Sequence, residues 1–203
     1  MTATAMPTTP LRLPDSYGYT VDDLHAIPED GRRYELIDGS IIVSPSATFG
    51  HNNLARWIAN ELERSASDRF VVGTDQSATI DDYNEPRPDV VVAQVKNVGR
   101  SPFPIDDAVL AVEVVSPSSV LRDRETKRAL YARAGVPVYW LIEPDDKALK
   151  IRLTEFVLGG AEDYVRRGSW ESGVVQTDTP WTLEIDLDAL TVRWAALMRR
   201  GGA

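Results

Sequence analysis

The spacing of hydrophobic positions predicts that helices and strands alternate along the chain. In residues 47–66, Leu54, Trp57, Ile58 and Leu62 fall on one face of an expected helix. Short apolar runs bounded by turn residues predict strands. The other expected elements are a short helix capped by Thr20, a hairpin turning at Asp38-Gly39, strand material in 69–80, strands at 89–93, 109–115, 137–142, 149–158 and 182–187, a helix at 121–134 ended by Gly135, and a final helix of about ten residues ending near Arg200.

This order of elements predicts an α/β fold built around a mixed sheet. A hairpin precedes the sheet and additional β-structure follows it. The chain has 203 residues, a length that suits one domain. Residues 1–16 form a Thr/Pro-rich segment that we expect to be a disordered tail, and we expect residues 17–203 to form the single domain.

Composition excludes several classes of site. The chain has no cysteine, which excludes disulfides, thiolate zinc sites, iron–sulfur clusters and cysteine nucleophiles. No apolar run is long enough to span a membrane, and the first residues do not resemble a secretory signal, so we expect a cytoplasmic protein. The net charge of −9 opposes a broad nucleic-acid surface, but the acidity lies mostly in the first half of the chain.

Two carboxylates occupy unusual positions. Asp89 opens the apolar run RPDVVV, and Glu113 lies inside VLAVEVV. An ionised carboxylate in such a strand is costly to desolvate unless a cation compensates it, and a shared divalent metal would do so. The alternatives are that Asp89 is an ordinary strand-start acid and that Glu113 pairs with an arginine.

The expected helix at 121–134 carries a third chemical group. Asp123, Lys127 and Tyr131 are spaced four residues apart and share one face. Either Lys127 points back toward Glu113, or it only pairs with Asp123 on the helix surface. On the first interpretation Lys127 belongs to an active site, and we expect Lys127→Met to leave folding nearly intact.

Five motifs follow one another along the chain, namely YELIDG (34–39), RPDVVV (87–92), LAVEVVSPSS (110–119), the Asp123/Lys127/Tyr131 face and AGVPVYWLIEP (134–144). In this order they resemble the Uma2 family, a bacterial group usually labelled restriction endonucleases with a PD-(D/E)XK nuclease fold. The similarity covers roughly residues 17–190 and implies a restriction-endonuclease-like core of the order α-β-β-β-α-β.

The resemblance implies the following site. Asp89 is the aspartate of the PD motif and Glu113 is the second acid, and with the backbone carbonyl of Val114 they would hold one Mg²⁺ or Mn²⁺. Val115 stands where the motif usually has its lysine. The resemblance places the replacement at Lys127, which would orient the attacking water or neutralise charge on the phosphate.

Two further residues bear on this site. Glu35 matches the glutamate of the family's first motif and would line the site, unless it is a solvent-facing strand residue. His51 lies in the first turn of the long helix, and we leave it out of the site because a lone histidine more often caps or decorates a helix.

The resulting hypothesis is a metal-dependent endonuclease that hydrolyses DNA. We also expect a homodimer, because many restriction-type nucleases pair their active sites and because Trp170, Trp181 and Trp194 add apolar surface outside the nuclease core. Two alternatives stay open. One is a nucleic-acid-binding module with weak catalysis, favoured by Val115 and the acidic charge. The other is a metal-dependent hydrolase of a small phosphoester.

Overall fold

A computed structural model describes residues 17–160 and 162–201, so the tail expected at 1–16 lies outside the described residues. Two strands, β4 and β6, are only two residues long and pair with each other in parallel. The elements in chain order are α1 (Val21–His25), β1 (Arg33–Ile37), β2 (Ser40–Ser44), α2 (Phe49–Ser65), β3 (Phe70–Thr74), β4 (Ala78–Thr79), β5 (Val90–Gln94), β6 (Phe103–Pro104), β7 (Ala108–Val114), a π-helical turn (Arg122–Lys127), α3 (Arg128–Arg133), β8 (Val138–Asp145), β9 (Lys150–Leu158), β10 (Tyr164–Trp170), β11 (Val174–Thr177), β12 (Leu183–Asp186) and α4 (Leu187–Gly201).

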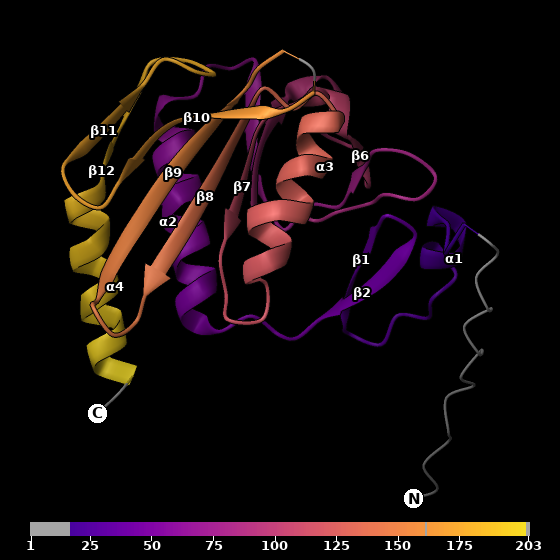
Figure 1. Ribbon diagram of the computed structural model, residues 1–203, viewed down its shortest axis with the longest axis horizontal. Coiled ribbons are helices and arrows are strands. Elements are labelled where there is room, and N and C mark those ends of the chain that lie inside the picture. Colours follow the sequence, from indigo (N-terminus) through magenta and orange to yellow (C-terminus); the bar gives the residue numbers. More distant parts are fainter. Residues whose placement is uncertain (1–16, 161, 202–203) are drawn as a thin grey trace, which may run out of the picture.

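The central sheet has six strands in the order β10-β9-β8-β7-β5-β3. Strands β7 and β8 run parallel, and the other neighbouring pairs are antiparallel. From α2 to β8, the elements that form this core follow the order α-β-β-β-α-β (Figure 1). The expected mixed α/β fold is therefore confirmed. A helical connection between β7 and β8 is required because parallel neighbours cannot be joined by a tight turn.

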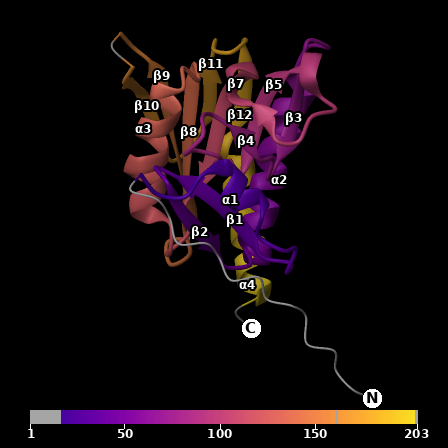
Figure 2. The same cartoon turned by 90° about the vertical axis from the view of Figure 1, so that its right-hand side faces the viewer.

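The sheet separates two hydrophobic cores. Strand residues alternate between them, so that Val90 and Val92 face one core while Val91 and Ala93 face the other. Helices α2 and α4 cover the first face, and α3 covers the second (Figures 1 and 2). The apolar stripe expected on α2 is fully confirmed, because its four residues are buried in the first core.

The N-terminal hairpin β1–β2 is separate from the central sheet and lies beside α1 (Figure 2). Asp38 and Gly39 have φ angles of 45° and 69°, the positive values that the expected type I′ turn requires. Thr20 caps α1 as expected, in a reciprocal capping box with Asp23. The turn and the helix cap that the sequence predicts in this region are therefore confirmed.

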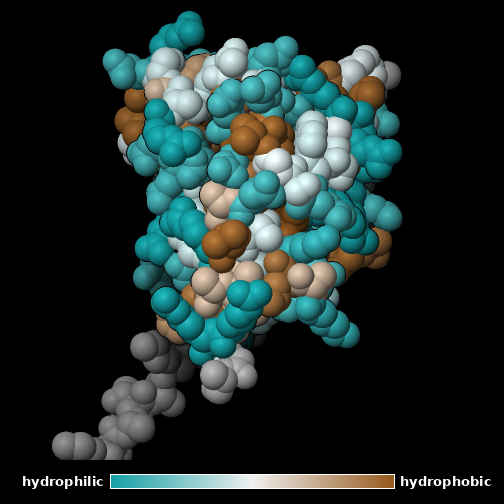
Figure 3. All heavy atoms as spheres, turned by 90° about the vertical axis from the view of Figure 1, so that its left-hand side faces the viewer, coloured by the Kyte–Doolittle hydropathy of each residue, from teal (hydrophilic) through white to brown (hydrophobic). Residues whose placement is uncertain are grey.

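The C-terminal segment packs against the first core. Helix α4 has 15 residues rather than about ten, because its apolar face continues along α2 and β9. Trp194 is buried in that core, and Trp170 and Trp181 pack against it. Figure 3 shows hydrophobic and hydrophilic residues interspersed over the side of the molecule that carries α4 and β11–β12. The tryptophans thus fill the β-extension of one chain and give no support to a dimer.

Within the described residues, no helix has the length and apolar character that a membrane crossing requires.

Candidate active site

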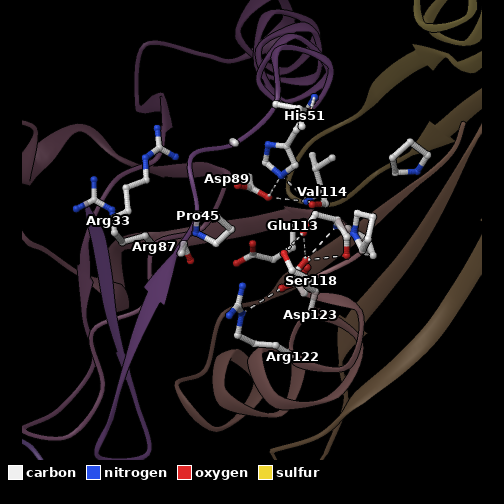
Figure 4. Close-up of a pocket in the computed structure, with 18 of the residues that line it drawn as sticks. Arg33, Pro45, His51, Arg87, Asp89, Glu113, Val114, Ser118, Arg122 and Asp123 are labelled. Carbon is white, nitrogen blue, oxygen red and sulfur yellow. Dashed lines mark hydrogen bonds and ion pairs between the residues drawn. The ribbon is translucent and has the colours of Figure 1, made fainter. Parts of the chain in front are cut away.

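The two expected acids lie side by side at one end of adjacent strands. Asp89 directly precedes β5, and β5 pairs with β7 in a register that sets Val90 opposite Val112. Continuing this antiparallel register brings Asp89 beside Glu113. The Asp89 Oδ2 accepts a hydrogen bond of 2.8 Å from the backbone N–H of Val114 (Figure 4). Both carboxylates line the same cavity.

Lys127 points back into this cavity. Its Nζ lies 2.9 Å from the Oε1 of Glu113 and 2.7 Å from the Oε1 of Glu35. Tyr131, one turn further along the helix, donates a 2.9 Å hydrogen bond to the same Glu113 oxygen. Lys127 is only 3% exposed. The alternative of a surface pair with Asp123 is therefore wrong, and so is the alternative that Glu113 pairs with an arginine.

The backbone that carries Lys127 is unusual. Residues Arg122–Lys127 form a π-helical turn rather than the first turns of an ordinary α-helix. The hydroxyl of Tyr139, on β8, donates a 2.7 Å hydrogen bond to the carbonyl of Asp123 in this turn. Such turns are frequent at functional sites because they redirect side chains. The sequence shows a helix here but carries no signal for the wider turn.

Glu35 comes to the cavity from the hairpin. It lies on β1, is 4% exposed, and accepts a 2.8 Å hydrogen bond from the backbone N–H of Arg87 as well as the contact from Lys127. The alternative of a solvent-facing strand residue is therefore wrong. The strand pattern alone does not reveal this, because the face that Glu35 occupies is covered only when the hairpin docks against the segment before β5.

His51 belongs to the cavity, contrary to the sequence-based interpretation. Thr48 caps α2 and accepts from the N–H of His51, which fixes the first turn of that helix. The His51 Nε2 lies 2.9 Å from the carbonyl oxygen of Val114 and 3.3 Å from the Oδ2 of Asp89. Because a carbonyl oxygen only accepts, Nε2 carries the proton. The position of His51 at the start of a capped helix was the available signal.

Electrostatics keep Asp89 ionised. Burial would raise the pKa of its carboxyl, but the hydrogen bond and charge of His51, together with the charge of Lys127, outweigh burial and lower the pKa. Burial would conversely lower the pKa of His51, and the hydrogen bond and charge of Asp89 raise it overall. The two groups therefore stabilise each other's charged forms.

The remaining acids behave differently. Burial raises the pKa of the Glu113 carboxyl well above its usual value, because the charge of Lys127 offsets only part of the lost solvation and other acids lie near. Burial also raises the pKa of Asp123 to about 6. For Lys127, burial lowers the pKa, but Glu113 and other carboxylates outweigh it, so its net pKa is raised and the lysine stays charged.

We call this site the acid cavity and define it by Glu35, His51, Asp89, Glu113, Asp123 and Lys127. Its volume is about 340 Å³. Three arginines also line it, namely Arg33, Arg87 and Arg122 (Figure 4). In the described part of the chain, no three His, Asp or Glu side chains are grouped so that they could hold a metal by themselves. A metal in the acid cavity would therefore have two carboxylates and backbone or water oxygens as ligands.

Sequence comparison assigns the chain to a family. Residues 21–178 match the family model of Uma2, described as "Putative restriction endonuclease". The chain belongs to the Uma2 family. No curated protein sequence matches this Uma2 chain.

Among solved structures, the Uma2 chain is similar to the crystal structure of a protein from Anabaena variabilis described as a "putative nuclease" of the DUF820 family. The TM-score is 0.69 at 16% sequence identity, and the match covers 87% of this chain and 98% of the other. At this identity the likeness establishes a shared fold, and function has to be argued from the site. The expected family and fold are thus both confirmed.

Proposed function

We propose that this Uma2 protein is a metal-dependent endonuclease that hydrolyses DNA phosphodiester bonds in the acid cavity. One observation carries the proposal. Asp89 and Glu113, from adjacent strands, line one cavity together with a buried lysine that contacts Glu113. In metal-assisted phosphodiester hydrolysis, acids hold the metal ion and a cation stabilises the charge that develops on the phosphate.

The charge of the acid cavity favours a divalent cation. Asp89 has His51 as its nearest cation, at 3.3 Å, and Glu113 shares Lys127 with Glu35. A buried carboxylate is costly to ionise without enough compensating charge, and burial already raises the pKa of Glu113. A hard divalent ion such as Mg²⁺ or Mn²⁺ beside Asp89 and Glu113 would stabilise the ionised form of both.

The available donors fit such an ion. Asp89 uses Oδ2 for its protein contacts and Glu113 uses Oε1, and within the described residues no hydrogen-bond partner occupies the second oxygen of either carboxylate. The carbonyl of Val114 accepts from His51 but has a second lone pair. Asp89, Glu113 and Val114 would therefore supply three oxygen ligands, with water completing the shell as Mg²⁺ usually requires. When bound, the ion would polarise the phosphate and acidify a bound water.

The protein's own groups would have distinct tasks. Lys127 keeps its charge and would neutralise the negative charge that develops on the phosphate, rather than act as a base. Lys127 would also take the place of the lysine that the motif usually has at position 115, because it contacts Glu113 from the helix. His51 would be a positioning residue, since it fixes both the carboxylate of Asp89 and the carbonyl of Val114.

Cleavage of labelled DNA by purified protein tests the proposal. We expect cleavage with Mg²⁺ or Mn²⁺, none with EDTA, and a loss of at least about a hundredfold in Asp89→Asn and Glu113→Gln. Asp188→Asn is the matched control, because Asp188 is an exposed acid on α4. Equal cleavage by the cavity variants and the control would point to a contaminating nuclease and refute the proposal.

Hydrolysis of a small phosphoester is a second candidate. The cavity of about 340 Å³ has a size typical of small-ligand pockets, and a small anion needs only a local cationic site on a protein of net charge −9. Competition between DNA and a small phosphodiester for the same enzyme separates the two candidates. The proposal also includes DNA as the substrate, a cytoplasmic location and a single domain from residue 17. It includes a homodimer as well, which now depends only on the resemblance to restriction-type nucleases that pair their active sites, because the three tryptophans pack within one chain.

A further inference from the structure

Two arginines form a fixed pair at one side of the acid cavity. The Nη2 of Arg33, on β1, lies 2.9 Å from Oδ2 of Asp75, and the Nε of Arg87 lies 3.2 Å from Oδ1 of the same residue. One carboxylate thus holds two guanidinium groups and leaves them a net positive charge. Figure 4 shows Arg33 and Arg87 together on one side of Asp89 and Glu113.

Asp75 ties this arginine pair to the acids. Its φ angle is 56°, a left-handed conformation that is costly for a residue other than glycine. Its N–H donates to the carbonyl of Asp89 at 3.2 Å, and its own carbonyl accepts from Arg87 at 2.9 Å. The backbone that carries Asp89 therefore also sets the position of the arginine pair.

Arg122 stands at a different side of the acid cavity. It opens the π-helical turn, and its Nε is buried without a hydrogen-bond partner in the described part of the chain. Among the described residues, its one carboxylate partner is Asp123, whose Oδ1 is 3.9 Å from Nε, which is too long for a hydrogen bond. Figure 4 shows Arg122 below the acids and pointing into the cavity. The Nε–H of Arg122 is therefore available to an anion that enters the cavity.

Glu113, which lies between these cations, is hard to reach. Glu113 is 2% exposed, and the cavity that gives access to it has a volume of about 340 Å³. A DNA duplex is stiff over about 150 base pairs, and proteins that bind it usually present a broad basic surface. This chain has a net charge of −9 and groups its cavity-lining cations in a small space. An unpaired strand bends easily and can place one phosphate deep in a pocket.

We propose that the acid cavity accepts an unpaired nucleic-acid strand, and that Arg33–Arg87 and Arg122 bind the phosphates on either side of the one that is cut. The inference rests on the proposed nuclease function, because it assumes that a phosphate approaches Asp89 and Glu113. It assigns Arg33, Arg87 and Arg122 to substrate binding, and Asp75 to positioning the pair of Arg33 and Arg87.

Oligonucleotides of one sequence test the proposal with the full chain. They are presented as unpaired DNA, unpaired RNA and blunt DNA duplex, and both cleavage with Mn²⁺ and binding by fluorescence anisotropy with EDTA are measured. We expect the unpaired forms to be cut at least about tenfold more efficiently than the duplex, and the comparison of DNA with RNA tells which sugar is accepted.

Arg87→Gln and Arg122→Gln should each raise KM by about tenfold with a smaller effect on kcat, since a charged hydrogen bond is lost in binding. Arg124→Gln is the control, because Arg124 is exposed and pairs with Glu143 outside the cavity.

Equal or better cleavage of the duplex would overturn the inference, and so would unchanged KM values in both cavity variants. If no oligonucleotide is cut, the nuclease function fails, and the binding measurement still decides the inference. Tighter binding of the unpaired strand that is lost in Arg122→Gln but kept in Arg124→Gln would support it. Absence of binding to any strand would overturn it.

Discussion

Lys127, which ends the π-helical turn, and Glu35, on the N-terminal hairpin, form a buried ion pair with 2.7 Å between Nζ and Oε1. The pair joins two segments that are far apart in sequence and belong to different secondary-structure elements. Because Lys127 also contacts Glu113, one ammonium group holds the hairpin, the helix and the central sheet together. The lysine is therefore structural as well as a candidate for catalysis.

This dual role changes the expectation for Lys127→Met. The sequence predicts that folding stays nearly intact, but the burial of Lys127 argues against this, because its loss would leave Glu35 and Glu113 without their nearest cation. We expect the free energy of unfolding to fall by about 3–5 kcal/mol near neutral pH. Urea denaturation measures it, with Lys147→Met as the exposed control.

The double variant Glu35→Gln/Lys127→Met makes this prediction sharper. Replacing one of the two stranded carboxylates should recover part of the lost stability, since less uncompensated charge remains buried. A loss below about 0.5 kcal/mol in Lys127→Met would instead match an exposed helix pair and contradict the structure.

Asp123 should make stability depend on pH. Burial raises its pKa from 3.8 to about 6, so between these values the folded state binds more protons than the unfolded state. Its contribution to the free energy of unfolding therefore falls as pH rises through this window. Asparagine does not titrate, so Asp123→Asn should gain up to about 3 kcal/mol relative to the wild type between about pH 4 and pH 8.

Urea denaturation in the presence of EDTA measures the free energy of unfolding across this pH range, with Asp188→Asn as the exposed control. If the free energies of unfolding of Asp123→Asn and the wild type differed by the same amount at every pH in this range, the pKa of Asp123 would not be raised.

His51 should affect metal affinity more than folding. Its Nε2 holds the carbonyl of Val114 and approaches the carboxylate of Asp89, the two groups that we assign to the metal together with Glu113. Loss of such a supporting contact typically weakens metal binding about 10–100-fold. Calorimetric titration of Mn²⁺ into His51→Ala measures the loss, and His51→Gln, which keeps a donor, should recover part of it. Identical affinities in all three proteins would remove His51 from the site.

The hairpin turn offers a test of the local structure. Gly39 has a φ of 69°, and a Cβ there would lie 2.7 Å from the carbonyl oxygen of Tyr17. We expect Gly39→Ala to lower the free energy of unfolding by at least about 1–2 kcal/mol. Gly99→Ala is the control, because a Cβ at Gly99 meets no atom within 4 Å. Equal stability of the two variants would argue against the described turn.

The sequence predicts those parts of the fold that local rules determine. Asp38-Gly39 requires a type I′ turn, and the apolar runs around Asp89 and Glu113 require covered strands. The sequence could not predict the contacts that depend on how separate elements dock. The burial of Glu35 depends on where the hairpin packs, and the role of His51 depends on how α2 meets β7.

A crystal soaked with Mn²⁺ tests the central claim most directly, because the anomalous signal locates the ion independently of activity. We predict one ion in the acid cavity, bound by Asp89, Glu113 and the carbonyl of Val114 with metal–oxygen distances of about 2.0–2.6 Å, and no ion in Asp89→Asn. Mn²⁺ bound only elsewhere, or retained unchanged in Asp89→Asn, would contradict the proposed metal site.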